Sequence, residues 1–269
     1  MRFFLLIALL PSFLRAEDPG LKGPGLEISL IAENATITPG QAFLAGVHLQ
    51  HFPGFHTYWQ SPGMVGMETS LEWKLPKGFK ASEIQWPYPE NTFMGQYPCH
   101  GYERDVTLLV TITPPKKITG KSVTLTTEAS WMCCAKGCFP GFQPLTLTLP
   151  VSDKPVPDPK NAALIAKAQN ELPATGHNVT ATLLSKPGAP VIEILFKRKE
   201  GFPRKGLYFF STDGQISSDQ TQKFLPQPNQ ALLLKIPRSE FSPENKTKVP
   251  GVLKIGKKSL AITAIPPEQ

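Results

Sequence analysis

The cysteine cluster of this chain lies in the stretch Trp131-Met132-Cys133-Cys134-Ala135-Lys136-Gly137-Cys138-Phe139-Pro140, which holds three of the four cysteines in 269 residues. Three residues separate Cys134 from Cys138, a spacing typical of a hairpin loop, and we expect Gly137 to adopt the positive φ that the last loop position requires. The two cysteines then face each other with Cα atoms about 4.5–5.5 Å apart, which a disulfide tolerates. The stretch therefore predicts two strands, a tight turn, and a disulfide that forms and opens with little backbone movement.

Segments of alternating polarity extend outward from this hairpin. Leu145-Thr146-Leu147-Thr148-Leu149 places leucine on one face and threonine on the other, the period-two pattern of a half-buried strand. Further segments of this kind cover residues 26–32, 43–49, 71–75, 106–112 and 123–127. About seven short strands separated by turn signals predict an all-β fold, with an immunoglobulin-like β-sandwich over residues 25–152.

The pattern changes after this sandwich. Residues 153–174 predict a linker and a helix, with Asp158 as the N-cap and Pro159 at the first helical position. The β pattern then resumes and predicts a second, smaller β-domain over residues 175–269. Because this block contains no cysteine, its simplest role is to support or orient the first domain.

The N-terminus has the pattern of an export signal. Arg2 precedes an apolar segment over residues 3–14, and Ala16 provides a small residue at the cleavage position. The segment is shorter than the ~20 residues of a membrane span, so we expect a cleaved signal peptide over residues 1–16 and no stable membrane insertion. The mature protein is then periplasmic or secreted, in a compartment where disulfides persist.

The charge pattern argues against nucleic acid as a partner. The formal net charge is +7, and removal of Arg2 and Arg15 with the signal peptide leaves +5. The basic residues are scattered in small groups, whereas nucleic-acid binding favours a basic face with interleaved aromatic residues. No arrangement of serine, histidine and acid indicates a hydrolase, and no glycine-rich loop between a strand and a helix indicates a phosphate site.

Thiol–disulfide exchange requires an attacking thiolate, a second thiol that resolves the mixed disulfide, and access for the partner. Cys134 and Cys138 supply both thiols without any cofactor, and the positive charge of Lys136 between them favours the thiolate. Trp131 and Phe139 are candidates to shield the pair from unrelated thiols. A permanent structural bridge is the alternative, although so short a loop constrains the unfolded chain little.

The other two cysteines permit two interpretations. Adjacent residues of a strand point to opposite faces, so Cys133 does not easily share a partner with Cys134. Cys99 and Cys133 are candidates for a second, structural disulfide. Alternatively, Cys99, His100 and the clustered cysteines bind a soft metal such as Cu(I). No C-x-x-C pair or spaced histidine motif indicates a zinc site, and we assign no metal ligand.

An aromatic stretch upstream, Phe55-His56-Thr57-Tyr58-Trp59, also has two interpretations. It is a core strand of the sandwich, or it forms a cap over the cysteine pair. In the second case His56 and Tyr58 are polar members of the site and Trp59 lines it.

Several motifs follow one another in a fixed order along residues 25–150. They are His56-Thr57-Tyr58-Trp59 with Pro62-Gly63, Leu75-Pro76-Lys77-Gly78-Phe79 with Ile84-Gln85-Trp86-Pro87, Gly101-Tyr102-Glu103, and Trp131, Cys134, Cys138 and Pro140. As an ordered set they resemble the N-terminal periplasmic region of the DsbD/ScsB type of thiol:disulfide interchange protein, and they are closer to ScsB than to the enterobacterial DsbD.

This resemblance implies that Cys134 and Cys138 are the redox pair and that the partners are periplasmic redox proteins, either thioredoxin-like proteins or a membrane electron donor. Full-length relatives continue into a membrane-embedded domain and a thioredoxin-like domain, and this sequence shows neither pattern. We therefore expect it to receive electrons from a separate protein and relay them as part of a protein-disulfide reductase system. Two alternatives remain: a copper-handling or copper-tolerance protein that uses the same cysteines, and a structural interaction module with inert disulfides.

Overall fold

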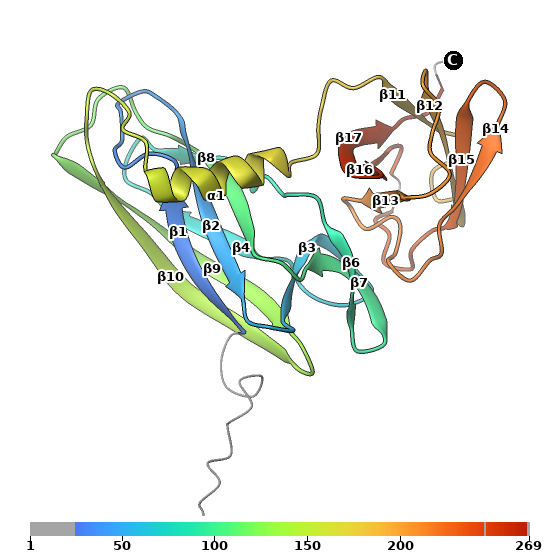
Figure 1. Ribbon diagram of the computed structural model, residues 1–269, viewed down its shortest axis with the longest axis horizontal. Coiled ribbons are helices and arrows are strands. Elements are labelled where there is room, and N and C mark those ends of the chain that lie inside the picture. The colour runs from blue at the N-terminus through green and yellow to red at the C-terminus, as the bar shows by residue number, and fades with distance from the viewer. Residues whose placement is uncertain (1–24, 245, 268–269) are drawn as a thin grey trace, which may run out of the picture.

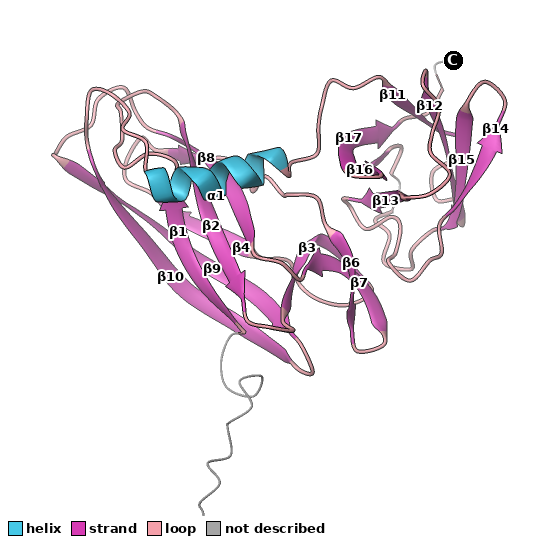
Figure 2. Cartoon of the chain, in the orientation of Figure 1, coloured by secondary structure: helices cyan, strands magenta, loops and turns pink. Residues whose placement is uncertain are grey.

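The computed structural model describes residues 25–267 except residue 245, and within them the chain forms two groups of β-sheets connected through one helix (Figures 1 and 2). The all-β class predicted from the sequence is confirmed. The predicted signal peptide, residues 1–16, lies outside the described residues. Within the described ranges, no helix is long and apolar enough to cross a membrane.

The first group, the N-terminal sandwich, contains two packed sheets. The first sheet has the order β1 (Leu26–Ala32), β2 (Phe43–His51), β8 (Val106–Thr113) and β5 (Lys80–Ala81). The second has the order β10 (Cys138–Pro150), β9 (Ser122–Cys134), β3 (His56–Gly63), β7 (Tyr97–Tyr102) and β6 (Glu90–Met94), with β4 (Ser70–Lys74) also paired to β9. Leu49 and Leu108 of the first sheet and Trp59 and Leu125 of the second belong to one buried core, which holds the two sheets together.

The β9–β10 hairpin is the longest element of this sandwich (Figure 1). Its antiparallel register is continuous from the pair Cys138–Cys134 at the loop to the pair Pro150–Ser122 at the other end. The alternating segments of the sequence predicted the part of this hairpin far from the loop. The structure extends both strands up to the cysteines.

Helix α1 (Pro159–Asn170) begins as the sequence predicted. Oδ1 of Asp158 accepts hydrogen bonds from the backbone N–H groups of Lys160 (3.0 Å) and Asn161 (3.2 Å), which satisfies two otherwise unpaired donors. Ile165 and Ala168 pack against Ile31 and Leu109, on the face of the first sheet that points away from the main core. The helix therefore covers the outer face of the sheet that lies opposite the cysteine hairpin.

The second group, the C-terminal sandwich, follows the helix. One sheet has the order β11 (Val179–Leu183), β12 (Val191–Arg198), β15 (Ala231–Pro237) and β14 (Lys223–Gln227), and the other has the order β13 (Leu207–Ser211), β16 (Val249–Ile255) and β17 (Lys258–Ala264). Ile194 and Phe196 of the first sheet share a buried core with Phe209 and Leu253 of the second. This sandwich thus has a core of its own.

The C-terminal sandwich contacts strands β3 and β7 of the N-terminal sandwich. The ring centroid of Phe210 lies 4.9 Å from that of His100 and 6.0 Å from that of Trp59. Nε2 of His100 lies 3.0 Å from the hydroxyl of Tyr208, and the hydroxyl of Ser218 donates to a backbone carbonyl of β7 at 2.6 Å. These contacts support the two strands whose opposite face points towards the cysteine pair.

Candidate redox site

A disulfide joins Cys134 at the end of β9 to Cys138 at the start of β10. Their Cα atoms are 4.2 Å apart and the two residues are direct cross-strand partners, so the hairpin register predicted from the spacing is present. The prediction for Gly137 is wrong, because this residue is not among the described residues with positive φ. The loop is instead closed by a hydrogen bond from the backbone N–H of Ala135 to the carbonyl of Gly137, at 2.9 Å.

The two sulfur-bearing residues differ sharply in exposure. Cys134 is completely buried, whereas Cys138 is exposed. The strand order explains this difference: Cys134 lies on β9, between β10 and β3, and is paired with His56, whereas Cys138 lies on β10, the edge strand of the sheet. An external thiolate can therefore reach Cys138 and cannot reach Cys134.

Tyr58 and His56 approach the disulfide from strand β3. The hydroxyl of Tyr58 lies 4.0 Å from Sγ of Cys138, and Nε2 of His56 lies 3.3 Å from the same hydroxyl. Burial raises the pKa of Tyr58 well above its ordinary value, and the neighbouring thiols Cys99 and Cys133 raise it further. Both rings are buried, so the disulfide has a neutral phenol beside its exposed sulfur.

Burial also acts on His56. It lowers the pKa of the imidazole below its ordinary value, and the negative charge of Glu103 opposes this effect only partly. His56 is therefore neutral at pH 7 and bonds to the hydroxyl of Tyr58 as an uncharged imidazole.

Of the other residues that the sequence suggested as site-lining, the aromatic ones pack in the core between the two sheets, whereas Lys136 lies in the loop between the two cysteines. Trp59 and Trp131 belong to the core between the two sheets, on the opposite face of the strands from Tyr58. Phe139 packs against that same core, and Lys136 is exposed in the hairpin loop. The alternation of side chains along a strand causes this division, because neighbouring residues of one strand face opposite sides.

Cys99 and Cys133 are free, buried thiols, so the expected second disulfide is absent from the structure. Cys133 lies in the core between the sheets, whereas Cys99 packs with Tyr58 and Cys134 on the other face, and this separation prevents the bridge. Burial raises the pKa of the Cys99 thiol to about 11 and that of the Cys133 thiol to about 12. Both thiols are protonated at neutral pH.

The residues suggested as soft-metal ligands are likewise divided between the two faces. His100 points away from Cys99, and its Nδ1 lies 3.3 Å from the carbonyl of Ser61 while its Nε2 lies near Tyr208. Among the described residues, no group of three or more His, Cys, Asp or Glu side chains is arranged to hold a metal ion.

The family model described as "Thiol:disulfide interchange protein DsbD, N-terminal" matches residues 29–150, which include the disulfide and Tyr58. Residues 29–150 are thus similar to the DsbD N-terminal family. The resemblance seen in the ordered sequence motifs is thereby confirmed. The match covers the N-terminal sandwich and ends before the helix, so it says nothing about the C-terminal sandwich.

The fold similarity extends beyond the matched residues 29–150. The N-terminal periplasmic domain of ScsB from Proteus mirabilis matches with a TM-score of 0.62 at 14% sequence identity, over 89% of this chain and 92% of that chain. The chain therefore shares its fold with that protein over the helix and the C-terminal sandwich as well. A marsupial T cell receptor also matches, at 12% identity over 92% and 99% of the two chains, but its TM-score of 0.23 supports no inference. No curated protein sequence matches the chain.

No direct signal in the sequence predicted the two methionines near the cysteine pair. Met94 on β6 and Met132 on β9 pack against Tyr58, Cys99 and Cys134. Met132 precedes Cys134 by two positions, so strand alternation alone places both on one face. Met94 comes from a distant strand, and only the order of strands in the sheet brings it to the site.

Proposed function

We propose that this protein is an exported thiol–disulfide interchange protein whose Cys134–Cys138 pair relays reducing equivalents to partner proteins in the periplasm. The observation that carries the proposal is the exposed Cys138 bonded to a fully buried Cys134, within residues similar to the DsbD N-terminal family. A structural bridge needs no exposed sulfur, whereas an exchange reaction requires one sulfur that a partner can reach.

The pair accepts electrons in two steps. A thiolate of a reduced donor attacks Sγ of Cys138, which forms a bond between the donor and Cys138 and breaks the Cys134–Cys138 bond. Cys134 leaves as a thiolate and takes up a proton. A second thiol of the donor then attacks the donor sulfur in the mixed disulfide and releases Cys138, so the donor is oxidised and the pair is reduced.

Delivery of electrons runs through the same exposed sulfur. The Cys138 thiolate attacks a disulfide of the target, and one target sulfur leaves as a thiolate. Cys134 then attacks Cys138 within the hairpin, re-forms the bond and releases the second target sulfur. Cross-strand pairing keeps Cys134 within bonding distance of Cys138 throughout, so this resolving step needs no large motion.

Tyr58 assists when Cys138 carries negative charge. Its hydroxyl lies beside Sγ of Cys138 and, as a neutral phenol, it can donate to a thiolate at that position. His56 orients the hydroxyl from the other side. In this proposal Tyr58 acts on the exposed sulfur and His56 is a positioning residue.

The proposed partners are a thioredoxin-like protein or a membrane protein as the donor, and oxidised periplasmic proteins as targets. The proposed location follows from the export signal in the sequence and agrees with the word "periplasmic" in the description of the Proteus mirabilis ScsB domain. The family name supports the thiol–disulfide chemistry of the residues that match it.

A redox titration with mass mapping tests the proposal. The purified protein is equilibrated in buffers of defined potential, free thiols are alkylated, and the modified cysteines are identified by mass. We expect Cys134 and Cys138 to change together from disulfide to dithiol at a potential above about −300 mV. A pair that stays oxidised well below that potential, or that is absent from the oxidised protein, contradicts an exchange role.

A further inference from the structure

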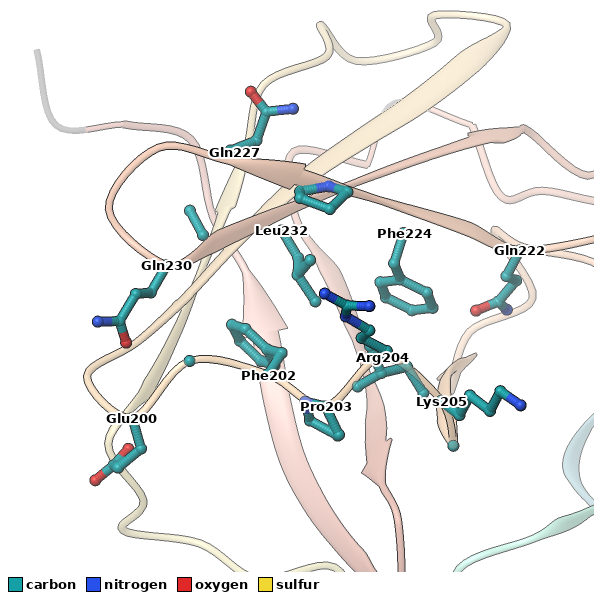
Figure 3. Close-up of a pocket in the computed structure, with 15 residues that line it drawn as sticks. Glu200, Phe202, Pro203, Arg204, Lys205, Gln222, Phe224, Gln227, Gln230 and Leu232 are labelled. Atoms are coloured by element: carbon teal, nitrogen blue, oxygen red, sulfur yellow. The ribbon is translucent and has the colours of Figure 1, made fainter.

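A second feature, remote from the redox pair, is a cavity of about 710 Å³ in the C-terminal sandwich (Figure 3). Residues 200–206, from the connection between β12 and β13, form one wall with Leu207 at the start of β13, and β14 with the start of β15 forms the other. No residue of the N-terminal sandwich lines it. The cavity opens between the two sheets, at one end of their shared core.

The inner wall of this cavity consists of apolar side chains that the rest of the protein buries only in part. Phe202, Leu207 and Phe224 are partly buried and pack against the core of the C-terminal sandwich, and Leu232 completes this wall. The ring of Phe224 lies 6.2 Å from that of Phe196, a fully buried core residue. The apolar wall is thus an extension of the core that the protein itself leaves open to solvent, and an apolar ligand group would gain by covering it.

The rim of the cavity carries unpaired positive charge. Arg204 and Lys205 are exposed, and neither forms an ion pair with any described residue. Figure 3 shows the side chain of Arg204 directed between Phe202 and Phe224, whereas Lys205 points outward. The one acidic residue of the lining, Glu200, is engaged by Arg198 at 3.1 Å and by Asn178 at 2.6 Å, so it does not neutralise Arg204.

Two strand edges flank the cavity. β14 and β13 are each the last strand of their sheet, so one side of each backbone has no neighbouring strand. On β13 the side-chain amide of Gln222 takes the place of a neighbour: its oxygen accepts from the N–H of Phe209 (2.8 Å) and its nitrogen donates to the carbonyl of Phe209 (2.7 Å). This edge therefore already binds one peptide-like group, and β14 remains free.

We infer that this cavity binds an extended acidic peptide segment of another protein, which adds to the free edge of β14. Alternate side chains of an added strand point to the same face, so one face of the segment must supply both the apolar side chains that reach Phe202 and Phe224 and a carboxylate for Arg204, which lies between them. Its carboxylates pair with Arg204 and Lys205. The charge of the rim selects acidic over basic segments, and the backbone edge selects an extended peptide over a compact anion.

The test uses the full-length oxidised protein and two fluorescent, end-capped nonapeptides, a glutamate peptide that repeats Val-Val-Glu-Glu and a lysine peptide that repeats Val-Val-Lys-Lys, so that each face of the extended peptide carries both valine and charge. We expect saturable binding of the glutamate peptide by fluorescence anisotropy, and binding of the lysine peptide at least about tenfold weaker. Arg204→Glu/Lys205→Glu should weaken binding of the glutamate peptide by at least about tenfold. The matched control, Lys116→Glu/Lys117→Glu, makes the same change in net charge on the N-terminal sandwich and should change affinity less than about twofold.

A second variant tests the apolar wall without changing charge. Phe202→Ala should weaken binding several-fold while thermal unfolding shows that the protein remains folded. The inference is overturned if the glutamate peptide does not bind, if both charge variants lose affinity equally, or if sedimentation shows that Arg204 and Lys205 instead hold two copies of the chain together. Lysine and proline also occur on edge strands that are protected from pairing, as Lys223 and Pro226 do on β14. If β14 is only a protected edge, the glutamate peptide will not bind.

Discussion

The hydroxyl of Tyr58 lies 4.0 Å from Sγ of Cys138, although 80 positions separate these residues in the sequence. The contact places a neutral hydrogen-bond donor beside the only sulfur of the pair that solvent reaches. Because β3 is the strand next to β9, Tyr58 reaches across the end of the hairpin from the interior of the sheet. The exposed cysteine thus has a fixed polar neighbour on one side and solvent on the other.

Tyr58→Phe removes this donor and keeps the ring. We expect exchange of the reduced protein with a small disulfide to slow by roughly twofold to fivefold, because a long hydrogen bond to the thiolate is worth less than the ~1.5–3 kcal/mol of a well-formed one. The rate is measured by stopped-flow at fixed pH. Tyr97→Phe, at a half-exposed position of β7, is the control and should leave the rate unchanged. If Tyr58→Phe and Tyr97→Phe react at the same rate, the hydroxyl of Tyr58 does not assist the exchange.

The two free thiols, Cys99 and Cys133, should not react with thiol reagents in the folded protein. Since burial raises the pKa of Cys99 to about 11, only about 10⁻⁴ of that thiol is ionised at pH 7, and the Cys133 fraction is smaller still. The oxidised protein should therefore show no reactive thiol with an aromatic disulfide reagent, and two thiols in denaturant.

The single variants Cys99→Ser and Cys133→Ser provide the control for this assay. Each should lower the count in denaturant from two to one and leave the Cys134–Cys138 bond intact. A native count above zero would show that one of these thiols is accessible, and would contradict the burial described above.

At Gly63 the backbone of the N-terminal sandwich lies close to the C-terminal sandwich. Gly63 has φ +92°, and an added Cβ would overlap the side chain of Ser218 in the C-terminal sandwich. Gly63→Ala should therefore destabilise the protein by about 3 kcal/mol or more, from backbone strain and the clash together. Gly54→Ala has a similar φ of +80° and open space around it, so strain alone should cost about 1–2 kcal/mol. Urea unfolding compares the two, and equal losses would mean that the contact with Ser218 does not constrain Gly63.

Two histidines with a lowered pKa should make the stability of the protein depend on pH. Burial lowers the pKa of both His100 and His51 from 6.5 to about 4, although backbone hydrogen bonds act in the opposite direction. Between these values the unfolded chain binds more protons than the folded protein, so stability falls as the pH is lowered from about 6.5 to about 4. Each histidine contributes a slope of about 1.4 kcal/mol per pH unit in that window.

His100→Gln isolates one of these contributions. Glutamine does not titrate, so the fall in unfolding free energy between pH 6.5 and pH 5 should be shallower than in the unchanged protein by up to the slope of one histidine. Urea unfolding at a series of pH values measures this difference. Parallel pH profiles would contradict the assignment of a depressed pKa to His100.

Local signals explain which parts of the fold the sequence predicted. The alternation of Leu145 to Leu149 and the cap formed by Asp158 both act within a few residues, and the structure contains the strand and the helix at those positions. β14 has no such local signal, because its residues, Lys223–Gln227, include Pro226 and do not alternate between apolar and polar types. Its identity as a strand comes from pairing with β15.

The site was predicted less completely for a related reason. The spacing of Cys134 and Cys138 predicts their cross-strand pairing, because only a three-residue loop separates them. Their unequal exposure depends on β10 being an edge strand and on β3 lying beside β9, and neither fact can be read from the stretch itself. The same strand order decides that Tyr58 approaches Cys138 while Trp59 and Trp131 face the core.

The most direct test of the central claim is to trap partners in cells with each single-cysteine variant of the pair. Cys134→Ala leaves the exposed thiol without its resolving partner, so it should accumulate mixed disulfides with other proteins, seen as higher-mass bands that disappear on reduction. Cys138→Ala leaves Cys134 and the two free cysteines, all of them buried, and should accumulate about a hundredfold less or none. Equal trapping by both variants, trapping by Cys138→Ala alone, or none by either would contradict a relay that acts through Cys138.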